Sequence, residues 1–512
     1  MIIKVIILVA FFAVMIGVGF VCRKKATDVN GFVLGGRSVG PWLTAFAYGT
    51  SYFSAVIFVG YAGQFGYKYG VAATWIGIGN ALLGSMVAWR VLGRRTRVMT
   101  QHLDSATMPE FFGRRFQSKK LKIAASLIVF IFMIPYTASL YNGLSRLFGM
   151  AFNIDYTVCI IVMAVLTGVY VIVGGYLATA INDFIQGIIM LFGIVAIIVS
   201  VLKINGGFTG SLDALANVMD TTASETPGVF ASFFGPDPLN LLGVVILTSL
   251  GTWGMPQMVQ KFYSIKSEKS ITKGTIISTL FAIIVAGGCY FLGGFGRLFA
   301  NNDMISQEGY DAIVPNMLSN LSPALIGLTV ILVLSASMST LSSLVMTSSS
   351  TLTIDVIKGN IVKDMSEKKQ VLWIRILIVI FIAISVVIAV IQYKTNVTFI
   401  AQLMGVSWGA MAGAFLAPLL YGLYWKRTTK WGCMASFIFG AGFMMYNMFF
   451  KATLPAILQS PINAGAFTMI MGLFIVPVVS LITKKPEEKF VEETFKCYEK
   501  TSTVHVTQSL EE

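Results

Sequence analysis

The chain has 512 residues, of which 56% are hydrophobic and only 12% are charged, and its formal net charge is +14. An ordinary soluble domain carries about 25% charged residues, so this composition excludes a soluble protein and indicates an all-α, polytopic membrane protein. In such a chain the excess of lysine and arginine indicates loops that orient the helices, not a nucleic-acid partner. The five cysteines include no CxxC pair, which argues against a metal cluster or a disulfide framework.

Apolar runs divide the chain into membrane spans. A spanning helix needs about 20 apolar residues, and on that criterion we predict about thirteen of them. The first is a retained helix and not a signal peptide, because its positive charges, Arg23, Lys24 and Lys25, follow the apolar run. The predicted spans are residues 2–21, 42–66, 71–92, 123–149, 157–173, 181–202, 240–260, 275–298, 324–348, 372–392, 398–424, 432–449 and 464–482.

Charge in the loops predicts the orientation of these helices. Lysines and arginines follow the third, seventh, eleventh and last spans, and Lys261 is counted here among the loop lysines. The charged residues within 203–239 and 299–323 are mainly acidic. Because basic loops stay in the cytoplasm, we expect a multi-pass protein of the cell membrane with its N-terminus outside and its C-terminus inside. Residues 484–512 are polar and of mixed charge, which predicts a partly disordered cytoplasmic tail.

Two of the predicted spans contain helix-breaking residues. The second span has Gly49 within Ala47–Ser51, and the seventh has Gly251, Gly254 and Pro256. Glycine and proline interrupt the backbone ladder, so the freed carbonyl and amide groups can face a cavity. The breaks lie five spans apart, which is typical of transporters built from inverted repeats around a site at the bilayer midplane. Glycines that serve only helix packing are the alternative explanation.

Polar groups inside the predicted spans mark candidate sites. Residues 334–353 contain eight serines at the end of an apolar run. At helical spacing, one face carries Ala336, Ser339, Thr340, Ser343 and Thr347, and it offers oxygen ligands of the kind that sodium prefers. Close helix packing is the alternative reason for such small residues. Asp183 begins the sixth span, where a carboxylate is either functional or an interfacial residue stabilised by the helix dipole.

Three motifs in this order resemble the sodium:solute symporter family, and the resemblance covers nearly the whole chain. They are GGRSVGPWLTAF at residues 35–46, GGYLATAINDFIQG at residues 174–187 and SMSTLSS at residues 337–343. The resemblance implies the LeuT-type fold of two inverted five-helix repeats. We therefore expect a leading helix and loop at 1–34, repeats at 35–202 and 203–430, two trailing helices at 431–483 and the tail at 484–512.

The same resemblance implies one or two sodium ions. The family's shared sodium site uses two carbonyl groups at the first break and three positions on the serine-rich helix. On this sequence these positions are Thr50 and Phe53, and Ala336, Ser339 and Thr340. The family's second sodium site matches Asp183, Ser342 and Ser343, with Ser339 shared.

The candidate solute residues are Ser54, Tyr52, Tyr136 and Trp253. Ser54 matches a solute-side serine of several branches of the family, whereas Tyr52 stands where the proline carriers have an aspartate. Tyr52 and the Asn182-Asp183 pair look closer to the pantothenate carriers. Tyr136 and Trp253 are aromatic residues that could line the pocket, although membrane aromatics more often serve packing or the interface.

These observations predict a sodium-coupled secondary symporter for a small, carboxylate-bearing organic solute such as an amino acid like proline, pantothenate or a monocarboxylate. No covalent chemistry is implied, so we do not expect an enzyme. The expected partners are the solute, sodium and the lipid bilayer, with no obligate protein partner. The chain has no GxxxxGK[ST] sequence, which excludes a P-loop nucleotide-driven pump. A proton-coupled symporter of the same fold and a channel are the alternatives.

Overall fold

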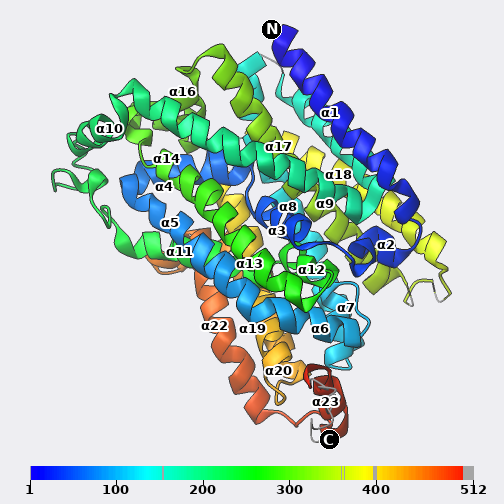
Figure 1. The fold of residues 1–512 in the computed structure, drawn as a ribbon. Helices are drawn as coiled ribbons and strands as arrows, with labels where there is room; N and C mark the ends of the chain where they lie inside the picture. Colours follow the sequence, from blue (N-terminus) through cyan, green and yellow to red (C-terminus); the bar gives the residue numbers. More distant parts are fainter. Residues whose placement is uncertain (1, 153–154, 359, 363, 396–399, 500–512) are drawn as a thin grey trace, which may run out of the picture.

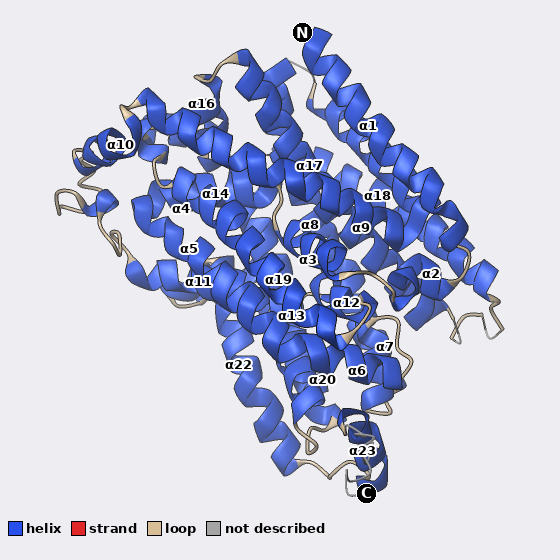
Figure 2. Ribbon diagram, viewed as in Figure 1, coloured by secondary structure: helices blue, strands red, loops and turns tan. Residues whose placement is uncertain are grey.

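The structure is a computed structural model that describes residues 2–152, 155–358, 360–362, 364–395 and 400–499. These residues form a helical protein, and no β-strand occurs among them (Figure 2). The N-terminus lies at one end of the molecule and the C-terminus at the other (Figure 1). Helices α10 and α16 lie toward the N-terminal end, and α6, α7 and α23 lie toward the C-terminal end.

The first part of the chain contains nine α-helices and three π-helical segments in the described residues. They are α1 (Ile2–Cys22), α2 (Val29–Leu34), α3 (Pro41–Tyr52), η3 (Val56–Tyr61), α4 (Ala62–Tyr69), α5 (Thr74–Gly79), η5 (Asn80–Val87), η6 (Trp89–Gly93), α6 (Arg94–His102), α7 (Met108–Arg115), α8 (Lys119–Phe152) and α9 (Tyr156–Ile204).

The second part begins after α9. Its helices are α10 (Gly207–Ala216), α11 (Pro238–Gly254), α12 (Pro256–Ser264), α13 (Glu268–Ala282), η8 (Ile283–Gly287), α14 (Gly288–Gly293), α15 (Asn302–Glu308), α16 (Ile313–Ser319), α17 (Pro323–Thr351), η11 (Leu352–Ile357), α18 (Glu367–Thr395) and α19 (Ile400–Tyr424). The trailing helices are α20 (Lys430–Phe450), α21 (Ala456–Gln459), α22 (Pro461–Ile482) and α23 (Glu488–Phe495).

A helix occurs at each predicted span. Within the described residues, nine helices are long and apolar enough to cross a membrane, and the bent pair of α11 and α12 makes a tenth. Two of the nine, at 47 and 49 residues, are long enough for two spans each. Both bend at a left-handed glycine, Gly70 (φ 62°) and Gly175 (φ 60°), a conformation that a side chain would strain. The count of thirteen spans itself stays a prediction.

Both predicted breaks are present, and one is displaced. Gly254 ends α11, Met255 is extended (φ −80°, ψ 118°), and Pro256 begins α12 at a bend of 45°. The first break follows α3 at Phe53 (φ −83°, ψ 122°), which is later than the predicted Ala47–Ser51. Gly49 itself remains helical, and the chain becomes extended four residues after it.

The serine-rich helix α17 lies at the centre of the molecule. It packs against α8, α9, α3, α12 and α18. Each residue from Thr329 to Thr351, apart from the partly exposed Ile331, is buried, including the eight serines of the stretch. Because α17 is surrounded by protein, its hydroxyl groups face other helices and not lipid, as polar groups inside a membrane must.

Helices α4 and α14, one from each part of the chain, meet at a seam that has no side chains between them. A Cβ atom at Gly66 of α4 would overlap the carbonyl group of Gly293, and a Cβ atom at Gly293 would overlap the carbonyl group of Ala62. The helices α4 and α14 are therefore in backbone contact, which only glycine permits.

The tail is more ordered than predicted in its described part. Helix α23 buries Val491 and Phe495, which lie four residues apart on one face. Beyond it, the hydroxyl group of Tyr498 donates to the carbonyl oxygen of Arg95 at 3.2 Å. The tail from Glu488 to Tyr498 is thus docked onto α6, and residues 500–512 of the predicted tail lie outside the described residues.

Candidate functional site

Five oxygen atoms meet where α17 crosses the first break, and we name them the oxygen cluster. The hydroxyl oxygen of Thr340 lies 3.0 Å from the Thr50 carbonyl oxygen and 3.2 Å from that of Phe53. The hydroxyl oxygen of Ser339 lies 3.2 Å from the same Thr50 carbonyl oxygen. Both hydroxyl oxygens are also close to the carbonyl oxygen of Ala336, at 3.0 and 3.1 Å. The structure thus brings together all five predicted residues of the shared sodium site.

The oxygen cluster has more acceptors than protons. Each hydroxyl group carries one hydrogen, so two protons serve five close approaches between oxygen atoms. The Thr50 and Phe53 carbonyl groups lie at the C-terminal end of α3, where a helix leaves its last carbonyls without helical partners. A hard cation would compensate the surplus of negative oxygen atoms. The set of oxygen atoms therefore fits a sodium ion. The end of α3 supplies two of them, the Thr50 and Phe53 carbonyl oxygens, because the helix ends where the chain becomes extended at Phe53.

A buried ion pair lies beside α17 at the second predicted site. The ammonium nitrogen of Lys261, on α12, is 3.8 Å from a carboxylate oxygen of Asp183, on α9. Lys261 is 2% exposed and Asp183 fully buried. The ammonium group also donates to the hydroxyl oxygen of Ser343 at 3.0 Å, and Ser343 lies 2.8 Å from the hydroxyl oxygen of Ser51. Lys261 is therefore not a loop lysine, as its position after an apolar run suggested.

The residues of the predicted second sodium site are only partly assembled around the Asp183 carboxylate group. Neither carboxylate oxygen of Asp183 accepts a hydrogen bond within the described part of the chain. Ser343 reaches Asp183 through the Lys261 ammonium group. Ser342 instead donates to the carbonyl oxygen of Ser339 at 2.9 Å, within its own helix.

Two of the four predicted solute residues contact one tryptophan, and a third, Ser54, lies beside one of them. The ring of Tyr52 meets the ring of Trp408, on α19, with the centroids 5.7 Å apart, and Tyr136 meets it at 6.1 Å. The Tyr136 hydroxyl group lies near that of Ser54. These four residues, which we call the solute cluster, each have a buried polar atom without a hydrogen bond of good geometry in the described residues. Unpaired polar atoms in an apolar wall are what a polar solute needs for orientation.

Trp253 is placed differently. Its indole nitrogen donates to the carbonyl oxygen of Leu83 at 2.9 Å, so it packs against η5. The ring contacts that the structure describes join it to none of the solute cluster. Its role in solute binding stays a prediction that this geometry does not favour.

Comparisons with known proteins identify the chain. A family model described as "Sodium:solute symporter family" matches residues 32–440. The chain belongs to the sodium:solute symporter family. It is 29% identical over 480 residues to the osmoregulated proline transporter OpuE of Bacillus subtilis strain 168, covering 93% of this chain and 94% of that protein. It is 31% identical over 496 residues to a sodium/proline symporter of Staphylococcus aureus strain JH9, covering 94% and 93%.

A solved structure has the same fold as this symporter. The chain superposes on a Na⁺-coupled sialic acid symporter in a substrate-bound, outward-open state with a TM-score of 0.71 and 17% identity, covering 95% of this chain and 99% of that one. This likeness confirms the predicted LeuT-type fold. Membership of the family confirms a sodium-coupled transporter of a multi-pass membrane type and excludes an enzyme.

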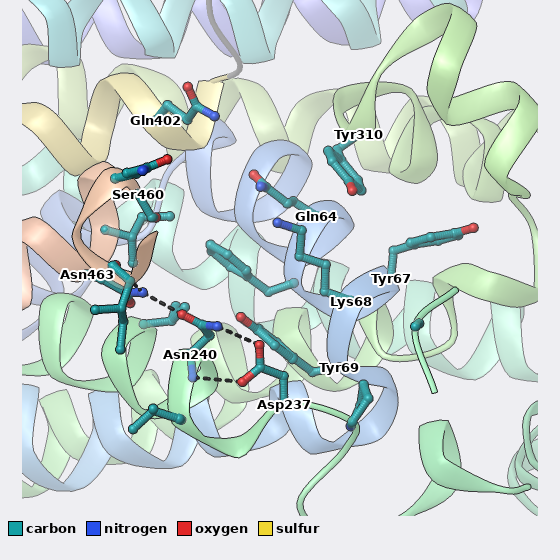
Figure 3. A pocket seen from close by; sticks show the side chains of 18 of the residues that line it. Gln64, Tyr67, Lys68, Tyr69, Asp237, Asn240, Tyr310, Gln402, Ser460 and Asn463 are labelled. Carbon is teal, nitrogen blue, oxygen red and sulfur yellow. Dashed lines mark hydrogen bonds between the residues drawn. The ribbon is translucent and has the colours of Figure 1, made fainter. Parts of the chain in front are cut away.

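The symporter also has an open pocket of about 870 Å³, lined in part by residues of the two acidic loops, 203–239 and 299–323 (Figure 3). Gln64, Tyr67 and Lys68 enter it from α4, and Tyr310 and Gln402 face them from other elements. Asn240 donates to Asp237, and Asn463 of α22 donates to Asn240, so one wall is fixed by hydrogen bonds. We call this cavity the outer pocket.

An ion pair fixes another part of the outer pocket. Arg297 donates to Asp220 at 2.8 Å, and both side chains are largely buried. Hydrogen bonds from Thr222, and then from Arg297 and Asn302, hold the pKa of Asp220 well below its usual range. The carboxylate group of Asp220 is therefore ionised and paired with Arg297. Lys68 is a second cation of the outer pocket, and its ammonium group lies over the Tyr310 ring at 5.2 Å from the ring centroid.

Two functional candidates were missed from the sequence. Lys261 looked like a loop residue because it follows an apolar run and precedes further lysines. Trp408 lies in the apolar run of the eleventh span, and nothing in that run distinguishes a pocket residue from a packing residue. The position of Lys261 five residues after Pro256 was the one available signal, since a helix that restarts after a break can return into the membrane.

Proposed function

We propose that the protein imports a small, carboxylate-bearing organic solute, driven by sodium bound at the oxygen cluster. The single observation that supports this proposal is the convergence of five oxygen atoms and only two protons at the first break. Each sodium ion that moves inward releases about 2.3 kcal/mol per 100 mV of membrane potential, before the concentration term. Alternating access around this midplane site would couple that energy to the solute.

Proline is the first solute to test. The two relatives reported above are named as proline transporters, and they cover more than nine-tenths of the chain. Pantothenate and monocarboxylates are the other candidates, because Tyr52 stands where proline carriers have an aspartate. The solute cluster offers aromatic faces and hydroxyl groups, which suit a small molecule with one apolar and one polar side.

The outer pocket supports the proposed orientation. It lies with the acidic loops, at the end of the molecule where α10 and α16 are found, and the N-terminus points to that end (Figure 1). With the basic loops in the cytoplasm, the outer pocket is the extracellular approach and the C-terminal α23 is cytoplasmic. The repeats at 35–202 and 203–430 would then meet at the oxygen cluster, with α3 from the first and α17 from the second.

One sodium ion would bind at the oxygen cluster, and the family resemblance implies a second near Asp183. That second ion has a competitor within the protein, because the Lys261 ammonium group lies beside the same carboxylate group. Proton coupling would use a membrane carboxylate in place of sodium, and a channel would need a continuous pore.

Uptake into proteoliposomes tests the proposal. The purified protein should accumulate radiolabelled proline, pantothenate or a monocarboxylate against its gradient when sodium is imposed outside, and not when potassium or a proton gradient replaces it. Accumulation that follows the proton gradient alone would establish the proton-coupled alternative. Flux that never exceeds equilibrium would establish the channel.

A further inference from the structure

Lys261 occupies a position that its chemistry makes costly. It lies on α12, five residues after Pro256, and its side chain is 3% exposed. A lysine near a helix end normally extends to the membrane surface, but this ammonium group points to Ser343 and Asp183 and over the ring of Tyr176 at 5.1 Å. A buried ammonium group is tolerated only with compensating partners, so the position requires the carboxylate group.

Asp183 has the matching requirement. It is fully buried, and both of its carboxylate oxygens lack hydrogen-bond donors within the described residues. Its ion-pair partner in the structure is Lys261 at 3.8 Å, a separation too long for a strong hydrogen bond. The attraction between these two groups is therefore an electrostatic one across a dry interior, where it is strong.

Charge balance limits what else the site can hold. With Asp183 negative and Lys261 positive, the site is neutral. A sodium ion added to it would leave one uncompensated positive charge in the membrane interior, which is costly. Without the ammonium group, the same sodium ion would make the site neutral.

We propose that the Lys261 ammonium group takes the place of a second sodium ion at Asp183, so that the protein carries one sodium ion per cycle, at the oxygen cluster. The proposal deepens the proposed function and rests on it, because it concerns the ion stoichiometry of the same transport cycle. It assigns Lys261 as the residue that excludes the ion, with Asp183 and Ser343 as its partners.

The Lys261 ammonium group is also covalently part of α12, a helix that would move in the proposed transport cycle. Lys261 belongs to α12, the helix after the second break, and reaches α9 through Asp183 and α17 through Ser343. Ser343 continues the connection to Ser51 of α3, one residue after Thr50 of the oxygen cluster. A free sodium ion could leave this position, whereas the ammonium group stays with its helix and keeps α12 tied to α9 and α17.

The experiment counts sodium ions bound to the purified full-length protein by equilibrium dialysis with ²²Na, which needs no knowledge of the solute. The wild type should bind one sodium ion, and Thr340→Ala should lose it. Lys261→Gln should bind two, because Asp183 then lacks its cation. Lys261→Arg should bind one, and so should Lys266→Gln, a matched removal of an exposed lysine five residues away.

The outcomes separate this inference from the proposed function. Two sodium ions bound to the wild type would overturn the inference and leave sodium coupling intact, as would one ion bound to both wild type and Lys261→Gln. No sodium bound to the wild type would contradict the proposed function itself. Should Lys261→Gln not fold, the charge-balanced double variant Lys261→Gln/Asp183→Asn should bind one ion, and a count of two there would overturn the inference.

Discussion

The hydroxyl oxygen of Thr340 lies 3.2 Å from the carbonyl oxygen of Phe53, the residue at which the first broken helix becomes extended. The two residues are 287 positions apart in the sequence. This contact joins α17 to the end of α3, and these helices belong to different predicted repeats. Sodium bound there would hold the repeats together, and loss of the ion would release them, which is how a small cation can control access to the solute.

Removal of the Thr340 hydroxyl group should weaken sodium activation. In Thr340→Ala a bound ion loses one ligand, so we expect the sodium concentration for half-maximal uptake to rise roughly 5–150-fold, corresponding to about 1–3 kcal/mol. Thr340→Ser should stay near the wild type. Ser337→Ala is the matched control, because within the described residues Ser337 donates only to Val333 of its own helix, α17. Equal sodium dependence in Thr340→Ala and Ser337→Ala would remove the oxygen cluster from the mechanism.

Tyr136→Phe should impair solute binding without weakening the fold. The Tyr136 hydroxyl group lacks a well-formed hydrogen bond in the described residues, so its loss should change the melting temperature little. A solute that uses this hydroxyl group should bind roughly 5–100-fold more weakly. Tyr141→Phe removes a similarly buried, unpaired hydroxyl group from the same helix and serves as the control. Titration of solute binding in detergent measures both variants, and equal affinities would exclude Tyr136 from solute binding.

Ser54→Cys should react with a thiol reagent, and transported solute should protect it. Ser54 follows the break, where half-helix ends can face an anionic group. Cys497, the partly exposed native cysteine, is first replaced by serine. Ser436→Cys is the control, since Ser436 donates to the carbonyl oxygens of Gly413 and Ala414 in the packing of α20 on α19. Labelling of Ser54→Cys that no transported solute slows would contradict its place beside the solute.

Asp183→Asn should destabilise the protein strongly, because it leaves the ammonium group of Lys261 buried without its counter-ion. Breaking a buried ion pair in this way costs about 3–5 kcal/mol. The double variant Asp183→Asn/Lys261→Gln should recover much of that loss. Chemical unfolding in detergent measures all three proteins. The structure places Asp183 inside α9 and fully buried, so the helix-start explanation does not apply. A single variant as stable as the wild type would show that Lys261 tolerates burial without this carboxylate group.

Gly66→Ala should prevent correct packing, since a methyl group there overlaps the backbone of Gly293. Overpacking of this kind costs about 1–3 kcal/mol or more. Gly442→Ala is the matched control, because a Cβ atom at Gly442 meets no heavy atom within 4 Å. The yield and melting temperature of the two purified variants test this, and a wild-type value for Gly66→Ala would mean that α4 and α14 separate easily.

The sequence predicted those features that depend on local chemistry. Span positions follow from apolar length, and the break at Pro256 follows from a residue that cannot continue a helix. The first break was placed too early because Gly49 is a local signal. The chain instead becomes extended at Phe53, whose carbonyl oxygen accepts a hydrogen bond from Thr340 of α17, far away in the sequence. Helical spacing placed Ala336, Ser339 and Thr340 of the oxygen cluster on one face, whereas Thr50 and Phe53 were expected only from the family resemblance.

Lys261 and Trp408 could not be assigned from the sequence, because burial depends on which helices surround a residue. A lysine after an apolar run has the same sequence pattern whether it enters the cytoplasm or the protein interior. Helix α23 could have been predicted from the sequence. Val491 and Phe495 have the four-residue spacing of one helix face, but the polar composition of the tail obscured this signal.

The backbone contact between Gly66 and Gly293 constrains how this protein changes shape. Helices separated by side chains can slide as rotamers change, but α4 and α14 have no such layer at this point. We therefore expect the two helices to move together at this seam, without sliding past one another. A change of shape would then arise where the helices are already interrupted, at the extended residues Phe53 and Met255, while the seam itself stays fixed.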